Sequence, residues 1–409
     1  MTLILRMAWR NLWRHKRRTW LTSTAMIFSN ILLVFMISLQ LGSYDMMINN
    51  TLRSFSGHLQ VQKAGYNESP KLRESIAAIE PLAAELRSAM PEYAISARAA
   101  GFALASSEQR SIGIQVIGVQ TDFEAGVSTI PGLVKDGRYL QSNEAAEIVI
   151  GTVMARNLKV QIGDEITLLG SGRDGSFAAG VATIVGLFES GVPDMDRSFA
   201  EVPLGYFQEV FAMEGHGHSV VVAVKQIDQV NSAVATARKL AANRQDLLVL
   251  DWNELNPGLK QAIQADMSSA WFMYAVLIIL VAFSVLNTQL MSVLERTREF
   301  GVITALGIKP GKLASLVMLE TALMALIGLF IGVFLGWLVA LYFNIAGFSY
   351  PGMDEMTQRF NLPSRIYPSV GWLSLMLGPS VVFLFCLLAS VYPALRLFKL
   401  RPVDAMRAV

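Results

Sequence analysis

The chain has 409 residues, of which 53% are hydrophobic and only 16% are charged. Average soluble domains carry about 25% charged residues, so this composition excludes a wholly soluble protein. The net charge of +2 does not favour nucleic acid as a partner. The only cysteine, Cys386, excludes an intrachain disulfide, so the soluble part must be held together by burial.

Residues 1–18 are basic and contain no acidic residue. Arg6, Arg10 and Arg14 are spaced four apart and form one stripe on a helix, beside a second stripe of Leu5, Trp9 and Trp13. A basic stripe next to an aromatic one is typical of a helix that lies in the membrane interface. The alternative, an unstructured basic segment, explains the regular spacing less well.

Four apolar segments are long enough to cross about 30 Å of hydrocarbon. They are residues 19–44, 267–294, 314–343 and 369–395. Basic residues precede the first span, and the tail 396–409 holds Arg396, Lys399, Arg401 and Arg407. The positive-inside rule therefore predicts that both termini are cytoplasmic. It also predicts that residues 45–266 and a short hairpin, residues 344–368, lie outside.

The segment 45–266 has the pattern of a soluble α+β domain. Residues 51–63 have a strand-like pattern, residues 71–90 a helical one, and residues 94–106 and 111–119 strand-like ones, so the first part, 45–120, reads as β-α-β-β. The last part, 211–266, reads as a second β-α-β piece. Between them, residues 121–210 are rich in glycine and short apolar runs, which predicts an all-β insert. We expect the two β-α-β pieces to pair across this insert.

Residues 295–313 form a charged segment between two spans. Glu295 can meet Arg298, and Arg296 can meet Glu299, on the surface of a helix. We expect the helix to have an apolar side made of Phe300, Ile303 and Leu306, a left-handed stop at Gly307, and a successor helix that starts at Pro310. The pattern fits either a solvated connecting loop or a rigid element that receives force from a partner.

The chain shows no nucleotide-binding or catalytic motif. The nearest match to a P-loop, residues 307–313, has glycines one residue too close and Leu313 in place of a hydroxyl residue. If ATP is used, another chain hydrolyses it. His216 and His218 flank a glycine, and a loop is favoured over a zinc site because no cysteine is near. Asp194 and Asp196 read as turn residues rather than a catalytic pair.

Several residues within the spans favour contacts with protein over lipid. Gly328, Gly332 and Gly336 are spaced four apart, which gives span three a flat face for span one, span two or another protomer. Glu320 is costly to leave in lipid, so we expect it to contact the charged segment 295–313 or a partner protomer rather than to reach the interface. Asn287 is also expected to face protein. The spans contain no continuous row of polar residues of the kind that would line an ion pore.

This order of elements resembles the FtsX/MacB/LolC–LolE type of ABC transporter permease. Residues 8–19 are similar to the entry helix of that family, and residues 137–140, 147–151 and 160–168 to its external domain. Residues 295–307 resemble its coupling segment and are the most specific match. Residues 392–396 and 401–407 resemble its C-terminal end. The resemblance covers essentially the whole chain.

The resemblance implies a bacterial inner-membrane subunit without catalytic activity or a cofactor of its own. It implies porter-like subdomains outside and a dimer of identical or related permeases bound to two separate ATPase subunits, which hold ATP and Mg²⁺. It assigns ATPase coupling by mechanotransmission to nine residues of the charged segment: Glu295, Arg296, Arg298, Glu299, Phe300, Leu306, Gly307, Lys309 and Pro310.

The function implied is extraction or export of a lipoprotein, a lipid or another amphipathic substrate, with membrane lipids and a periplasmic or outer-membrane carrier as further partners. The alternative is an FtsX-like signalling scaffold that regulates a periplasmic enzyme or sensor and transports nothing.

Overall fold

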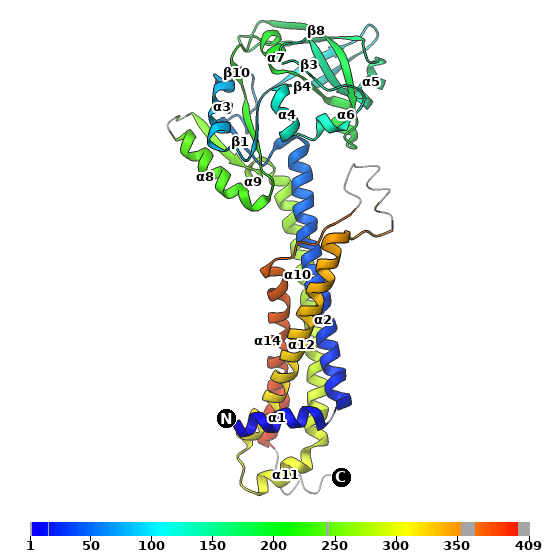
Figure 1. Ribbon diagram of the computed structural model, residues 1–409, viewed down its shortest axis with the longest axis vertical. Helices are drawn as coiled ribbons and strands as arrows, with labels where there is room; N and C mark the ends of the chain where they lie inside the picture. The colour runs from blue at the N-terminus through cyan, green and yellow to red at the C-terminus, as the bar shows by residue number, and fades with distance from the viewer. Residues whose placement is uncertain are drawn as a thin grey trace. The chain divides into compact units, whose positions relative to one another are not determined.

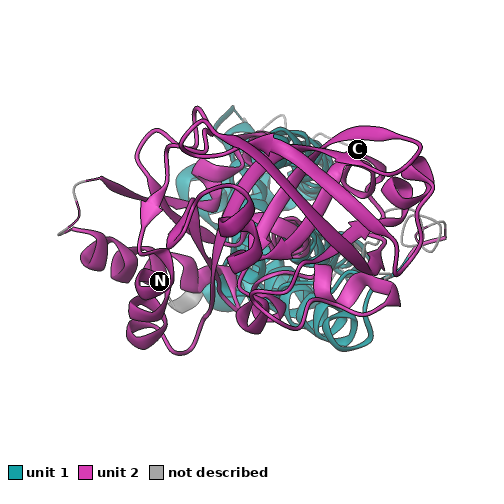
Figure 2. Cartoon of the chain, turned by 90° about the horizontal axis from the view of Figure 1, so that it is seen from above, with its two compact units in different colours: residues 1–44, 262–349, 365–409 teal, residues 45–261, 350–364 magenta. Residues whose placement is uncertain are grey.

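A computed structural model describes residues 2–14, 16–242, 244, 246–351, 353 and 365–399. The chain divides into two compact units (Figure 2). The membrane unit comprises Met1–Tyr44, Ala262–Ser349 and Arg365–Val409, and the soluble unit comprises Asp45–Gln261 and Tyr350–Ser364. The basic residues Arg401 and Arg407 of the tail, and residues 352 and 354–364 of the hairpin predicted at 344–368, lie outside the described residues.

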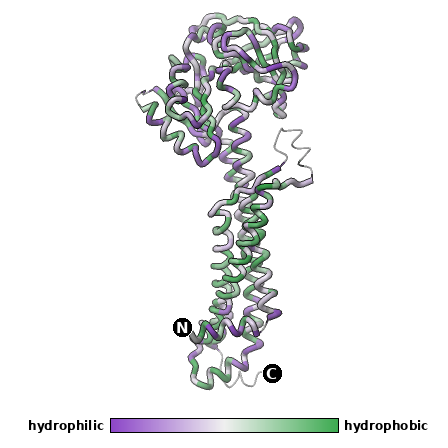
Figure 3. The backbone as a smooth tube through the Cα atoms, in the orientation of Figure 1, coloured by the Kyte–Doolittle hydropathy of each residue, from purple (hydrophilic) through white to green (hydrophobic). Residues whose placement is uncertain are grey.

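The membrane unit is helical. Its elements are α1 (Thr2–Arg14), α2 (Lys16–Thr51), α10 (Pro257–Glu295), α11 (Thr297–Ala305), α12 (Pro310–Ala346), α14 (Trp372–Arg396) and a 3₁₀ turn (Leu397–Lys399) (Figure 1). Within the described part of the chain, four segments have the length and hydropathy of membrane spans, and they overlap α2, α10, α12 and α14. Figure 3 shows hydrophobic residues along these helices. The predicted fold class, four spans with an α+β soluble domain, is confirmed.

The glycine face of α12 packs on α2. A Cβ atom added at Gly328, Gly332 or Gly336 would lie 2.5–2.9 Å from the Cβ atom of Met26, Asn30 or Val34, respectively. The Asn30 amide also donates to the carbonyl oxygen of Gly328 at 3.2 Å. Among the three partners that the sequence left open, the structure thus selects span one, because only glycine lets the two backbones approach this closely.

A polar cluster joins α2 to α10 at the end of the membrane unit near Tyr44. The Tyr44 hydroxyl donates to Asp266 at 2.6 Å, and Gln40 donates to the same carboxylate at 3.3 Å. The Tyr274 hydroxyl donates to the Gln40 amide oxygen at 2.6 Å. These bonds fix the pairing of the two helices.

The soluble unit is built on one large mixed sheet. Its strands are β1 (Leu59–Lys63), β3 (Ala94–Ser106), β4 (Ser111–Val119), β5 (Val134–Gly137), β6 (Glu147–Gly151), β7 (Glu165–Ser171), β8 (Phe177–Phe188), β9 (Phe199–Pro203), β11 (Ser219–Ala223) and β12 (Leu247–Asp251). The order is β12-β1-β11-β3-β4-β9-β6-β8-β5, with β7 paired to β3 and β8. A separate two-stranded sheet pairs β2 (Ile76–Ala77) with β10 (His216–Gly217).

Strands from the two ends of the soluble segment pair with one another. β1 lies between β11 and β12, antiparallel to both, and β11 continues the sheet to β3. The predicted pairing across the insert is therefore confirmed. The helices α3 (Ile79–Ala89) and α8 (Val230–Ala241) belong to the two halves and contribute to one shared hydrophobic core.

Three local predictions for this unit were wrong. Residues 51–56 are helical, because no breaker interrupts the helix before Gly57, which has a φ of +67°. The helix predicted at 71–90 begins only at Ile79, after Ala78 in a left-handed conformation. The insert 121–210 is not all-β, since four short helices bury side chains in it: α4 (Thr121–Val127), α5 (Thr152–Leu158), α6 (Pro193–Ser198) and α7 (Leu204–Val210).

Buried charges connect β3, α4 and β9. The Arg98 guanidinium, 3% exposed, donates to both carboxylate oxygens of Glu124, which is fully buried. Glu201 is also fully buried and accepts a hydrogen bond from the Tyr139 hydroxyl at 2.6 Å. Burial, and then repulsion from Glu124, raise the pKa of Glu201 from 4.5 to about 8. One arginine thus faces two carboxyl groups, and Glu201 favours its protonated form.

We expect Gly332→Ala to destabilise the membrane unit by about 1–3 kcal/mol, because its methyl group has no room beside Asn30. Thermal unfolding of the full chain in detergent measures this loss. Gly311→Ala is the matched control in the same helix, where an added Cβ would lie 3.9 Å from its nearest neighbour. Equal melting temperatures for the two variants would contradict close packing of α12 on α2.

We expect Glu201→Gln to flatten the pH dependence of the stability of the soluble unit. The pKa of Glu201 is raised in the folded state. The contribution of Glu201 to stability is therefore fully present below pH 4.5 and is lost as the pH rises through about 8. One such group gives a slope of at most about 1.4 kcal/mol per pH unit. The full chain is unfolded with urea in detergent at several pH values, and proteolysis of the soluble unit reports its unfolding. The slope of the unfolding free energy against pH is then compared between the variant and the wild type. Glu189→Gln, at an exposed carboxylate, is the control.

Candidate coupling site

The segment between α10 and α12 forms a helix and a tight turn. α10 ends at Glu295, Arg296 leaves the helical conformation with a φ of −100° and a ψ of 12°, and α11 follows. Gly307 has a φ of +93°, and its N–H donates to the carbonyl of Thr304 at 3.0 Å. Pro310 occupies the first turn of α12. The helix–turn–helix arrangement predicted for this segment is confirmed.

Phe300 anchors α11 to the membrane unit. It is 1% exposed and belongs to a hydrophobic cluster from α10, α11, α12, α14 and the last 3₁₀ turn. The cluster consists of Val293, Phe300, Leu313, Ala314, Val317, Ala394 and Leu397, with Ile303 packed against it. Leu306 does not extend this face, although its spacing predicts that it should. It is 79% exposed, because α11 ends at Ala305 and the chain turns.

A buried ion pair lies beside this cluster. The Arg296 guanidinium is 3.1 Å from both carboxylate oxygens of Glu320 on α12, and these side chains are 9% and 3% exposed. The Arg296 guanidinium also lies 4.9 Å from the centre of the Phe300 ring. Glu320, placed by its sequence near the start of a span, thus contacts the coupling segment.

The ion pair extends to α1 through Asn11. The Asn11 side-chain amide donates to the Glu320 carboxylate at 2.7 Å. On the outside, Glu299 lies 3.4 Å from Arg296 and 3.7 Å from Arg14 of α1. Asn11 is not among the site residues predicted from the sequence. The signal was present, because Asn11 is a polar residue next to the apolar positions Ala8 and Leu12, which are both buried.

The turn after α11 presents an exposed aliphatic surface, which we call the coupling tip. It consists of Val302, Leu306 and Ile308, which are 46%, 79% and 41% exposed. Arg298 and Lys309 are exposed beside it. The residues assigned to coupling therefore divide into two groups. Arg296 and Phe300 are buried and fix the segment in place, whereas Leu306, Gly307 and Lys309 are on the surface.

Asn287 does not face the interior of this chain. It is exposed on α10, whereas its neighbour Gln289 is 1% exposed. The expectation that Asn287 contacts protein is thus not met within the described residues of a single chain. A helix has only part of its circumference in contact with its own bundle, and the sequence does not indicate which part.

Residues of the soluble unit that were considered as metal or catalytic candidates, among them His218 and Asp196, make structural contacts. His218 is 1% exposed, accepts from the backbone N–H of Ala100 at 2.9 Å and stacks on Tyr66. Burial lowers the pKa of His218 to about 4, so the ring is neutral. Asp194 and Asp196 were predicted as turn residues but lie on the short helix α6, where the Asp196 carboxylate accepts from the backbone N–H and the hydroxyl of Ser190. Among the described residues, no three His, Cys, Asp or Glu side chains form a group suited to a metal ion.

Comparison with known proteins matches both units. The FtsX-like permease C-terminal family covers residues 271–402, and the MacB-like periplasmic core domain covers residues 19–240, which is more than half of the chain. This chain belongs to the FtsX/MacB family of ABC transporter permeases. The resemblance inferred from the sequence motifs is confirmed, and the soluble unit is the periplasmic domain of this permease.

Named relatives include subunits of two kinds of transporter. The permease is 26% identical over 308 residues to the lipoprotein-releasing system transmembrane protein LolC of Xylella fastidiosa, covering 71% of this chain and 72% of LolC. It is 23% identical to the macrolide export ATP-binding/permease protein MacB of Neisseria gonorrhoeae, covering 67% of this chain and 40% of MacB. The extracellular domain of YknZ, from Gram-positive bacteria, aligns over 47% of this chain and 98% of its own with 18% identity and a TM-score of 0.36.

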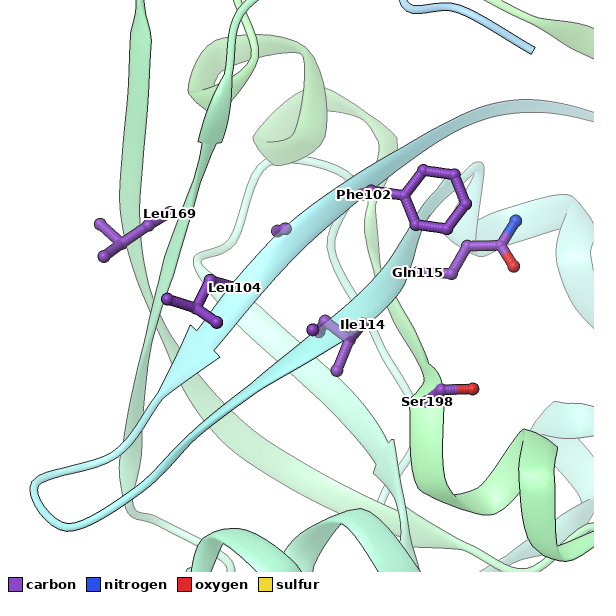
Figure 4. Close-up of a pocket in the computed structure, with 8 residues that line it drawn as sticks. Phe102, Leu104, Ile114, Gln115, Leu169 and Ser198 are labelled. Atoms are coloured by element: carbon purple, nitrogen blue, oxygen red, sulfur yellow. The ribbon is translucent and has the colours of Figure 1, made fainter. Parts of the chain in front are cut away.

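The periplasmic domain of the permease carries an uncovered apolar area on its sheet. Cross-strand pairs place Phe102 and Leu104 of β3 on the same face as Leu169 of β7 and Phe177 of β8. Phe102 and Phe177 are 69% and 77% exposed. A groove of about 400 Å³ lies here, with side chains of β3, β4 and β7 around it (Figure 4). Its lining residues are all uncharged: Phe102, Ala103, Leu104, Gly113, Ile114, Gln115, Leu169 and Ser198.

We expect Glu320→Gln to destabilise the permease by about 3–5 kcal/mol, because Arg296 would stay buried without its counter-charge. Thermal unfolding in detergent measures the loss. Arg296→Gln should cost a similar amount, and the double variant less than the sum of both, because the two residues are directly coupled. Glu299→Gln, at the exposed pair with Arg14, should change stability by at most about 1 kcal/mol. If the stability losses of the two single variants simply added in the double variant, a direct interaction between Arg296 and Glu320 would be contradicted.

Proposed function

We propose that this permease couples ATP hydrolysis by two separate ATPase subunits to motion of its periplasmic domain, and that this motion extracts or exports an amphipathic substrate. The observation that carries the proposal is the coupling tip. Three aliphatic side chains are exposed on α11 and the turn after it, and this segment is anchored by the buried residues Phe300 and Arg296. Exposed apolar patches bordered by polar residues mark protein interaction sites, and an ATPase is the partner expected of this family.

A rigid connection from the tip into the membrane supports mechanical coupling. A displacement of α11 acts on α12 through the Arg296–Glu320 pair and on α1 through Asn11. α12 in turn packs on α2 through its glycine face, where a Cβ atom added at any of the three glycines would lie within 3 Å of an α2 side chain. Close-packed elements transmit strain because their interiors contain few voids. ATP and Mg²⁺ would be bound by the ATPase subunits, and the permease would contribute only the coupling surface.

A second permease is the expected partner at α10. Five residues spaced three or four positions apart are all exposed on this helix: Leu280, Phe283, Asn287, Met291 and Leu294. This spacing is that of a helix–helix seam, and a polar asparagine within such a seam specifies how the helices pair. An amide in contact with lipid would lack hydrogen-bond partners, which further supports a protein neighbour, either an identical chain or a related one.

The uncharged groove on β3, β4 and β7 supports an amphipathic substrate or a carrier that delivers one. Its apolar lining suits acyl chains or apolar side chains, and a site for a charged solute would need charged groups. The distribution of basic residues supports cytoplasmic termini in a bacterial inner membrane. The same orientation puts the coupling tip in the compartment that contains ATP.

We expect Leu306→Glu to abolish ATPase binding without unfolding the permease, since Leu306 is 79% exposed. The permease is co-expressed with its ATPase, and co-purification and vanadate-sensitive ATP hydrolysis in lipid nanodiscs are measured. The loss should be at least about tenfold, because a carboxylate would be buried without a partner at the interface.

Leu248→Glu is the matched control, since it places the same charge on an exposed leucine of the periplasmic domain. It should leave co-purification with the ATPase unchanged. Normal ATPase binding and substrate-stimulated hydrolysis by Leu306→Glu would contradict the proposal. If the wild-type permease instead stimulated ATP hydrolysis without any substrate and co-purified with a periplasmic enzyme or sensor, it would be a signalling scaffold.

A further inference from the structure

A groove between α1 and α12 lies outside the coupling tip and the periplasmic domain. It has a volume of about 480 Å³ and is lined by Leu5, Arg6, Trp9, Arg10 and Leu323. Four of these residues come from α1, and Leu323 comes from the membrane-spanning helix α12. Its volume falls within the range typical of sites for small ligands.

The groove combines two kinds of surface. Leu5 and Trp9 are each 47% exposed, and Leu323 adds a third apolar wall. Arg6 and Arg10 are exposed and follow Leu5 and Trp9 around the helix, so they form a cationic rim beside the apolar floor. Residues 1–18 contain no acidic residue that would neutralise this rim.

We propose that this groove binds an anionic glycerophospholipid of the membrane in which the permease sits, with an acyl chain along Leu5, Trp9 and Leu323 and the phosphate at Arg6 and Arg10. The charge complementarity favours an anionic headgroup. The position favours a membrane lipid over a protein ligand, because one wall belongs to a membrane-spanning helix. Tryptophan and basic residues on one helix are typical of the membrane interface.

The lipid would act on the coupling site through α1. Ala8 and Leu12 are buried, and Asn11 lies on the same side of α1, where it donates to Glu320. Leu323 is one turn along α12 from Glu320. A lipid bound in the groove therefore ties α1 to α12 beside the ion pair that holds the coupling segment. This inference concerns lipid binding alone and does not require that the permease transport anything.

The test compares phosphatidylglycerol with phosphatidylcholine on the full-length permease. The protein is purified from nanodiscs that contain both lipids, and native mass spectrometry counts the molecules of each that remain bound. Wild type should retain phosphatidylglycerol selectively and should melt at a higher temperature in its presence. Arg6→Gln/Arg10→Gln should lower this retention by about tenfold or more, since each cationic residue strengthens the attraction to anionic lipid.

Lys16→Gln/Arg17→Gln is the matched control, because it removes two charges from the same basic segment but not from the groove. It should keep the selective retention. Leu323→Trp should fill the groove and lower retention without changing the charge, and its melting temperature in phosphatidylcholine verifies that it folds.

Equal losses in Arg6→Gln/Arg10→Gln and Lys16→Gln/Arg17→Gln would show general electrostatic attraction and would overturn the site. Unchanged retention in Leu323→Trp would overturn the position given to the acyl chain. If Arg6→Gln/Arg10→Gln instead released the ATPase subunit in lipid-free detergent with lipid retention intact, the groove would be a protein contact. Loss of lipid selectivity with normal ATPase coupling would leave the proposed transport function standing.

Discussion

The ion pair between Arg296 and Glu320 is the interaction on which the organisation of the membrane unit depends. Moving two charges out of water is costly, and the cost is offset only when each charge has its partner and further hydrogen bonds. Here Asn11 donates a further hydrogen bond to the Glu320 carboxylate, and the Phe300 ring lies beside the Arg296 guanidinium. The pair therefore holds only if α1, α11 and α12 are all in place, which makes their positions interdependent.

The same principle operates in the periplasmic domain, where Arg98 and Glu124 are buried together and Glu201 lies near them. In each unit a charged residue joins elements that are far apart in the sequence. The surroundings differ, because both carboxyl groups near Arg98 are buried, whereas at Arg296 only Glu320 is buried and the second carboxylate, Glu299, is exposed. The periplasmic cluster is thus sensitive to pH in a way that follows directly from its composition.

Local signals were sufficient for the elements whose residues act on their immediate neighbours. Gly307 specifies the end of one helix because glycine can adopt a positive φ, and Pro310 specifies the start of the next because its ring fixes φ. Periodicity was less informative about burial. Phe300 and Leu306 share a helical spacing, but one is buried and the other exposed, because burial depends on where α14 and the turn lie. The helical residues 51–56 show the same limit, since a strand-like pattern was overridden by continuation of the preceding helix.

The sequence by itself determined the four spans, the charged helix and turn at residues 295–313, the pairing of the two halves of the soluble segment and the family, because these follow from runs, spacings and motifs along the chain. Only the tertiary structure decided that the glycine face of α12 meets α2, that Glu320 meets Arg296 and Asn11, and that Asn287 faces away from the bundle. The physical reason is that a polar or flat helical face indicates the need for a partner, whereas the choice of partner depends on the packing of residues that are hundreds of positions apart.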